Sequence, residues 1–234
     1  GGNAMEKAQE KTRKAISAVL AGVLLMAAAG WAGPTYSFTN ITNNNAQDAA
    51  IGEAQLAVEL FDLGSQAQFV FSNIGPEASS IADVYFDDGT NAIFAATIAS
   101  IDNSVSGVSF SAGAAPGNLP GGNAAPWNFS ATGGLTADAD PPVQPNGVNP
   151  GESLGITLDF AGGSDFDDLL NELATQDFRI GLHVQGFASG GSEGFITDGP
   201  PPSVVPTPGS LLLASIGISA VGLLRRHKNR HLTD

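Results

Sequence analysis

The 234-residue sequence contains no cysteine. Disulfide bridges, thiol nucleophiles and Cys-ligated metal sites are therefore excluded, and stability has to come from packing. A body of roughly 170 residues buries enough surface to fold without covalent links. The lack of cysteine therefore does not argue against export.

Basic residues are almost missing from the middle of the chain. Of the nine Lys and Arg residues, Arg179 alone lies between positions 15 and 224, where 20 of the 23 acidic residues also lie. Such a surface repels phosphate backbones, which proteins bind through Lys and Arg, so nucleic-acid binding is excluded. The excess of negative charge favours solubility and makes divalent cations the natural counterions.

Residues 5–32 have the composition of a secretory signal peptide. Met5 is followed by a basic stretch, an apolar run over residues 15–29 and then the small residues Gly30 and Ala32. Small side chains at these last two positions suit signal peptidase, which predicts cleavage after Ala32. The apolar run is short for a membrane span of roughly 20 residues, so removal is favoured over the alternative of a retained anchor.

A second apolar run lies near the C-terminus. Its 16 uncharged residues, 209–224, follow a Pro-rich linker over residues 199–208 and predict a transmembrane helix. Proline ahead of the run keeps the linker out of the helix and open to a processing enzyme. The positive-inside rule places the tail, residues 225–234, in the cytoplasm and the body outside. The cations of this tail are Arg225, Arg226, Lys228 and Arg230.

A short motif, an apolar helix and an arginine cluster in this order resemble the PEP-CTERM sorting signal of Gram-negative bacteria. The motif reads Val205-Pro206-Thr207-Pro208, with Thr207 where the family usually has Glu. The resemblance implies recognition by exosortase, a membrane protease that cuts near the motif, and an association with exopolysaccharide. It also implies transient anchoring in the inner membrane before transfer to the cell surface or the extracellular matrix. A plain C-terminal anchor is the alternative.

Residues 33–198 are expected to form a mainly β body, an antiparallel β-sandwich of jelly-roll type with one short helix. Apolar and polar residues alternate in short runs that turn residues separate. The Asp88-Gly89 step between two of these runs predicts a hairpin. Repeated short strands favour a sandwich or a jelly roll. Strands are expected near residues 55–60, 68–72, 81–86, 93–99, 105–110, 154–158 and 178–185.

The segment 112–153 interrupts this pattern. It is rich in Gly, Pro and Asn, and it predicts a long surface loop without regular elements. Trp127 and Phe129 are the residues expected to attach the middle of this loop to the core.

One helix is expected in the body. Ser164 is the expected N-cap, and the Asp residues of the first turn suit the positive end of the helix dipole. The helix is predicted from an apolar stripe at helical spacing, formed by Phe166, Leu169, Leu170 and Leu173.

Motifs for catalysis are not found in the body, and we expect no catalytic residue. Its single histidine, His183, has no Gly-x-Ser-x-Gly elbow to accompany it and is expected to face solvent or to be bonded structurally. We expect no cofactor. Calcium is the one ion that we consider as a candidate. The weak candidate residues for binding calcium do not match a twelve-residue calcium loop. We favour the interpretation that they lie in solvated turns. These candidates are Asp87, Asp88, Asp138 and Asp140.

The leading hypothesis is an exported, non-catalytic surface or matrix protein. One alternative is a carbohydrate-binding module, calcium-dependent or not, on a jelly-roll scaffold. Another is a glycan hydrolase on the same scaffold, which needs two carboxylates facing each other across a cleft. The few aromatic residues, 13 Phe, 2 Trp and 2 Tyr, provide little material for stacking on sugars.

Overall fold

The computed structural model of the protein describes residues 33–90 and 92–197, and these residues belong to one compact unit. The predicted signal peptide, linker, transmembrane helix and basic tail lie outside the described residues. None of the helices within the described ranges is both long and apolar enough to cross a membrane. The strands are β1 (Thr35–Asn40), β2 (Leu56–Asp62), β3 (Gln66–Asn73), β4 (Ser80–Asp87), β5 (Phe94–Asp102), β6 (Phe110–Ala112), β7 (Thr136–Ala139), β8 (Ser153–Phe160), β9 (Arg179–Gln185) and β10 (Glu193–Thr197). The helices are α2 (Ala46–Gln55), α3 (Val143–Asn146) and α4 (Phe166–Thr175).

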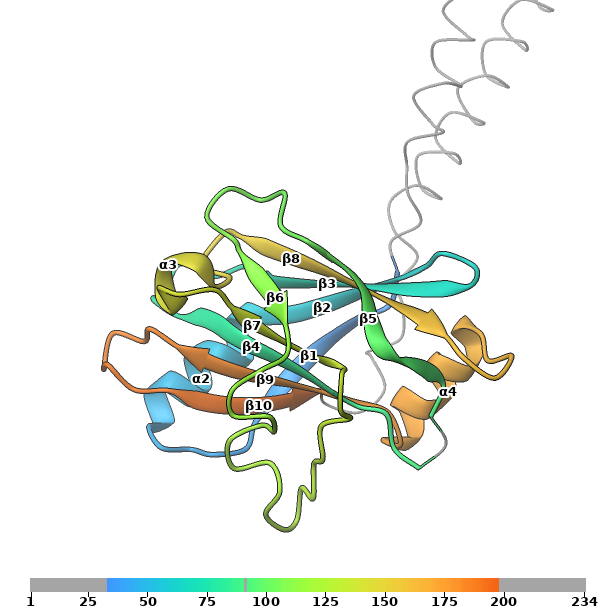
Figure 1. The fold of residues 1–234 in the computed structure, drawn as a ribbon. Helices are drawn as coiled ribbons and strands as arrows, with labels where there is room; N and C mark the ends of the chain where they lie inside the picture. The colour runs from blue at the N-terminus through green and yellow to red at the C-terminus, as the bar shows by residue number, and fades with distance from the viewer. Residues whose placement is uncertain (1–32, 91, 198–234) are drawn as a thin grey trace, which may run out of the picture. The chain divides into compact units, whose positions relative to one another are not determined.

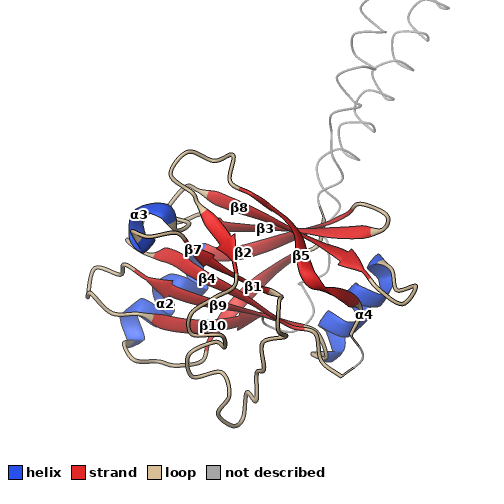
Figure 2. Ribbon diagram, viewed as in Figure 1, coloured by secondary structure: helices blue, strands red, loops and turns tan. Residues whose placement is uncertain are grey.

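The ten strands form one antiparallel sheet in the order β5-β8-β3-β2-β1-β10-β9-β4-β7-β6 (Figure 1). β1 joins the two halves of this sheet, because its first three residues pair with β2 and its last three pair with β10. The outer strands β5 and β6 contact each other, so the sheet is nearly closed on itself (Figure 2). The prediction of a mainly β body is confirmed.

The two halves of the sheet enclose the main hydrophobic core. β3 alternates half-buried and buried residues, and it turns Phe69 and Phe71 inward. The ring of Phe69 lies 5.0 Å from that of Phe86 in β4 and 6.0 Å from that of Phe178, which precedes β9. Aromatic pairs of this kind contribute about 0.5–1.5 kcal/mol beyond their buried area. They connect one half of the sheet to the other.

The hairpin predicted at Asp88-Gly89 is wrong. β4 pairs with β7 and β9, whereas β5 pairs with β8, so the chain crosses here from one half of the sheet to the other. The buried carboxylate of Asp88 accepts the backbone N–H groups of Ile93 and Phe94, each at 3.1 Å. Gly89 has φ +50°, and a Cβ there would lie 2.5 Å from the carbonyl oxygen of Asp177. Glycine at position 89 therefore allows the backbone to pass close to Asp177 where the chain crosses between the two halves of the sheet.

The segment 112–153 contains regular elements that its composition does not predict. β7 lies between β4 and β6, and α3 is a single turn that follows it. Residues 113–131, which we call the strap, lie on the outer face of the sheet. Phe129 of the strap is fully buried in a second, smaller core, which confirms its predicted role in attaching the segment. The other buried members of this core are Tyr85, Leu119 and Ile196, and Trp127 packs against them.

Two further expectations need correction. The predicted strand at 105–110 contributes only Phe110 to β6, because residues 105–108 form a turn in which the N–H of Val108 donates to the carbonyl of Val105. Helix α2 was not expected, since Ile51 is its one large apolar residue. Asn45 caps this helix, and Gly52 lies directly against the ring of Phe195. Helix α2 therefore packs against the sheet through the close contact of Gly52 with Phe195, and not through an apolar stripe.

The helix expected after the strap segment is confirmed as α4, but its cap is Asp165 and not Ser164. Asp165 has an extended backbone, and its carboxylate accepts the N–H groups of Asp167 and Asp168 at 3.0 and 3.1 Å. The side chain of Asp168 accepts the N–H of Asp165 in return, which completes a capping box. The expected cap was one residue too early.

Replacing Asp165 by Ala should lower the free energy of unfolding by about 1 kcal/mol, the usual cost of losing an N-cap. Ser164→Ala is the matched control and should leave that free energy nearly unchanged. Urea denaturation followed by circular dichroism measures both variants. Equal losses in the two variants would contradict the assignment of the cap.

Candidate functional site

Three ionisable side chains form a row across neighbouring strands. Asp83 of β4 stands opposite Asp138 of β7 on one side and His183 of β9 on the other. Directly opposed residues on paired strands point to the same face of a sheet. We call Asp138, Asp83 and His183 the carboxylate–histidine row. It lies on the outer face, beside the start of the strap.

Asp83 is the buried centre of this row. Its Oδ2 lies 2.8 Å from Nδ1 of His183, and the two side chains are 5% and 13% exposed. Its Oδ1 is buried, and no N–H or hydroxyl group among the described residues donates to it. Asp138 stands opposite Asp83 on the neighbouring strand, so its carboxyl group faces the charge of Asp83.

The surroundings of Asp138 favour its protonated form. Desolvation, followed by the charge and the hydrogen bond of Asp83, raises the pKa of Asp138 to about 6, although the backbone N–H of Ala115 opposes the change. Burial and the charges of Asp83 and Asp138 raise the pKa of Tyr85, which therefore stays neutral. Its hydroxyl donates to the carbonyl of Pro116 at 3.0 Å. Tyr85 therefore holds the start of the strap at Pro116.

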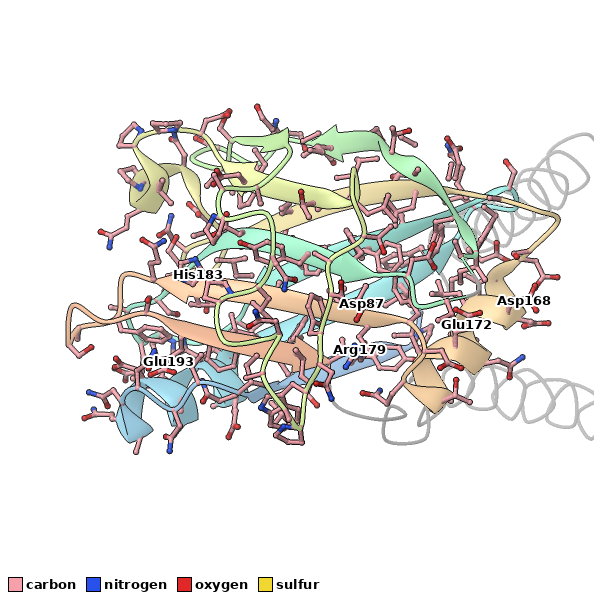
Figure 3. The ribbon with its side chains drawn as sticks, turned by 60° about the horizontal axis from the view of Figure 1, so that its bottom comes forward. Asp87, Asp168, Glu172, Arg179, His183 and Glu193 are labelled. Atoms are coloured by element: carbon pink, nitrogen blue, oxygen red, sulfur yellow. The ribbon has the colours of Figure 1, made fainter. Side chains whose placement is uncertain are left out.

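The end of the strap is held by an ion pair. Arg179 of β9 stands opposite Asp87 of β4 and binds its carboxylate, and Figure 3 shows the two side chains together. Arg179 also donates to the carbonyls of Trp127 and Asn128, and Asp87 accepts the N–H of Ser130 at 3.1 Å. No other Lys or Arg lies within the described residues. This pair therefore uses the one strong cation of the described part.

The four calcium candidates do not converge on one site. Asp87 binds Arg179, Asp88 binds two backbone N–H groups, and Asp138 belongs to the row. Within residues 33–90 and 92–197, no three His, Asp or Glu side chains are placed to hold a metal ion together. The structure therefore identifies none of these carboxylates as a metal ligand. Asp140 has a lowered pKa because it accepts the hydroxyl groups of Ser109 and Ser111, at 2.6 and 2.8 Å.

A second acidic group lies along α4. Burial, followed by the charges of Asp88, Asp177 and Asp168, raises the pKa of Glu172. Asp168 and Glu172 both project from α4 (Figure 3) and line a shallow pocket. Oε2 of Glu172 is buried without a hydrogen-bond partner in the described part. The surroundings of Glu172 therefore favour its protonated form. The described residues that line this pocket do not form a recognisable catalytic arrangement.

Glu193 of β10 has the opposite surroundings. Its carboxylate is buried and accepts hydrogen bonds from Thr42, from the side chain of Asn40 and from the backbone N–H groups of Asn44 and Asn45. Burial opposes ionisation, but these donors outweigh it and lower the pKa of Glu193. Glu193 lies beside α2 in Figure 3 and fixes the turn that leads into this helix. Its role is to hold the turn and the helix against the sheet.

No protein-family model matches the chain, and no curated protein or solved structure matches it either. Arguments about function therefore depend on the sequence signals and on the geometry described above.

Sequence reasoning identified His183 as solvent-facing or structurally bonded, and the structure shows it bonded to Asp83. It missed Asp83 and Glu193. The alternation of β4 places Asp83, Tyr85 and Asp87 on one face, which was the available signal for a polar row. The partners of these residues could not be found in this way, because they come from strands distant in the sequence.

Replacing Glu193 by Gln should lower the free energy of unfolding at pH 7 by about 1.5–3 kcal/mol, the range for hydrogen bonds to a charged group. The folded-state pKa lies below the ordinary value of 4.5. The stabilisation by the charge is therefore present above pH 4.5 and is lost as the pH falls through the folded-state pKa. Urea denaturation between pH 3 and pH 7 measures this difference. Glu77→Gln, at an exposed position, is the control and should have little effect.

Replacing Asp138 by Asn should raise the free energy of unfolding at pH 8 by about 1 kcal/mol, allowing for solvent screening at this half-buried position. The folded-state pKa of about 6 exceeds the ordinary 3.8. In the wild-type protein, the contribution of Asp138 to the free energy of unfolding is therefore complete below pH 3.8. This contribution is lost as the pH rises through 6. The gain should shrink towards zero near pH 4.

The matched control for this variant is Asp140→Asn, which removes a charge two residues away. Because Asp140 is stabilised in its charged form, the control should not gain stability at pH 8. An equal gain in both variants would show that general charge reduction is responsible.

Proposed function

We propose that the chain is an exported, non-catalytic surface or matrix protein whose tail is processed by exosortase, as in the PEP-CTERM family. The observation that carries this proposal is the order of its terminal sequences. A signal peptide precedes the body, and a proline motif, an apolar run and an arginine cluster follow it. The protein is held in the inner membrane by the apolar run until the tail is cut.

The described body supports this proposal. The described residues belong to one compact unit, and the members of both core clusters lie between Tyr36 and Ile196. Cleavage at the two predicted positions would leave all of these packing contacts in place. A processed product would therefore keep its fold after release.

The charge of the body also supports it. The described residues contain Arg179 as their one Lys or Arg, and Asp87 neutralises it. The remaining surface charge is negative, which keeps a protein soluble at high local concentration. Such a surface suits accumulation among extracellular polymers.

For the fold, we propose a β-sandwich with a jelly-roll-like arrangement. The strands β5-β8-β3-β2-β1 and β1-β10-β9-β4-β7-β6 form two halves around a common core. Two sheets that pack inner faces together define a sandwich. Here β1 is shared between them.

Mass spectrometry of the mature protein from its host tests the proposed processing. The expected product begins at Gly33 and ends between Pro206 and Pro208. Deletion of the host's exosortase gene should leave the tail attached. An intact mass through Asp234 in both strains would instead identify a plain anchor.

A pair of variants locates the recognition element. Pro206→Ala, within the motif, should reduce processing, whereas Pro202→Ala, in the same linker but outside the motif, should not. The processed and unprocessed forms are separated by mass in extracts of the same host. Equal processing of both variants would contradict recognition through the motif.

A further inference from the structure

Gly33, the residue that follows the predicted signal peptide, lies directly on the backbone of β2. A Cβ at this position would be 1.5 Å from the carbonyl oxygen of Leu60. The carbonyl of the next residue, Pro34, accepts the N–H of Leu60 at 3.0 Å. Glycine is therefore the residue that fits at position 33 without displacing β2, since it allows a close approach of two backbones.

The backbone nitrogen of Gly33 has a carboxylate partner. Its N–H donates to Oε1 of Glu59 at 3.0 Å in a half-buried contact. Glu59 stands opposite Thr35, so its side chain reaches back past the start of β1. Within the described ranges Arg179 is the one Lys or Arg, and it binds Asp87. No Lys or Arg side chain of the described part therefore neutralises Glu59.

The same nitrogen would be released by removal of the signal peptide. Hydrolysis of the Ala32–Gly33 bond takes up one water, and it leaves a carboxylate on Ala32 and an ammonium group on Gly33. An α-amino group has an ordinary pKa of about 7.7–8.0, so it is mostly charged at neutral pH. The cut would thus replace a neutral N–H donor by a cation at hydrogen-bonding distance from Glu59. Hydrogen bonds between charged partners are roughly twice as strong as neutral ones.

We propose that Glu59 is a capture site for the α-amino group of the mature protein, and that the cut after Ala32 strengthens the fold by completing this ion pair. A cut one bond away would displace the amino group from Glu59, because consecutive Cα atoms are about 3.8 Å apart. The element that gains the attachment is β1, which joins the two halves of the sheet. This inference rests on the cleavage position of the proposed function.

Urea denaturation of four chains tests the capture site without the host. They begin at Gly33 or at Ala32, carry either Glu59 or Glu59→Gln, extend to the C-terminus of the sequence and are studied in detergent micelles. Unfolding is followed by the emission of Trp127, the single tryptophan once Trp31 is absent. Glu59→Gln should lower the folding equilibrium constant about fivefold more in chains that begin at Gly33, the upper range for a partly exposed ion pair. This difference should shrink in about 1 M NaCl.

Glu53→Gln is the matched control. The carboxylate of Glu53 accepts the N–H of Asn40 at 3.0 Å, a backbone group that the cut does not change. This control should affect chains that begin at Gly33 and at Ala32 equally. An equal effect of Glu59→Gln in the two chains would overturn the proposal. If Glu59→Gln fails to fold, the two wild-type chains alone decide, since equal stability of these chains would also refute the capture site.

Gly33→Ala separates the requirement of the fold from that of signal peptidase. The small residues that suit the peptidase, Gly30 and Ala32, are unchanged, so the host should still cut this variant after Ala32. The added Cβ meets Leu60, so the amino group should move and the effect of Glu59→Gln should fall to that in chains beginning at Ala32. Mass spectrometry of the wild-type protein from the host distinguishes the two proposals. A start at another residue would overturn both, whereas a start at Gly33 without the fivefold effect would overturn the capture site alone.

Discussion

Every residue of β4 is buried, with Phe86 packed in the main core and Tyr85 packed under the strap on the other face. A strand covered on both faces cannot leave its polar side chains in water. Asp83 and Asp87 therefore need partners within the protein, since unpaired buried charges are costly. The register of the sheet supplies His183 for the first and Arg179 for the second. The strap and its attachments follow from this double coverage.

Comparison of the acidic side chains of Glu193 and Asp138 shows how the surroundings decide their behaviour. Glu193 receives several hydrogen bonds and no close carboxylate, so it is held in its charged form. Desolvation and the facing charge of Asp83 raise the pKa of Asp138 to about 6, so Asp138 is neutral in acidic solution. The same type of group thus fixes a turn in one place and carries a removable proton in another. Counting acidic residues in the sequence cannot distinguish these cases.

Much of the fold could be predicted from the sequence, because local patterns determine it. β8, β9 and α4 have clear alternation or a clear apolar stripe, and they were found close to their observed positions. α2 and β7 were missed because the first packs through Gly52 and the second is a four-residue strand whose core residues are only Ala137 and Ala139. The site was beyond local reasoning. Asp83 and His183 are separated by 100 residues, so only the assembled sheet shows them as a pair.

The near closure of the sheet has a consequence for crowded surroundings. An open edge strand offers unpaired backbone groups to other chains and so promotes edge-to-edge polymerisation. Here the two outer strands face each other, and β5 carries irregularities in its pairing with β8 that make it a poor template. The described fold therefore disfavours edge-to-edge growth into fibrils, even at high protein concentration.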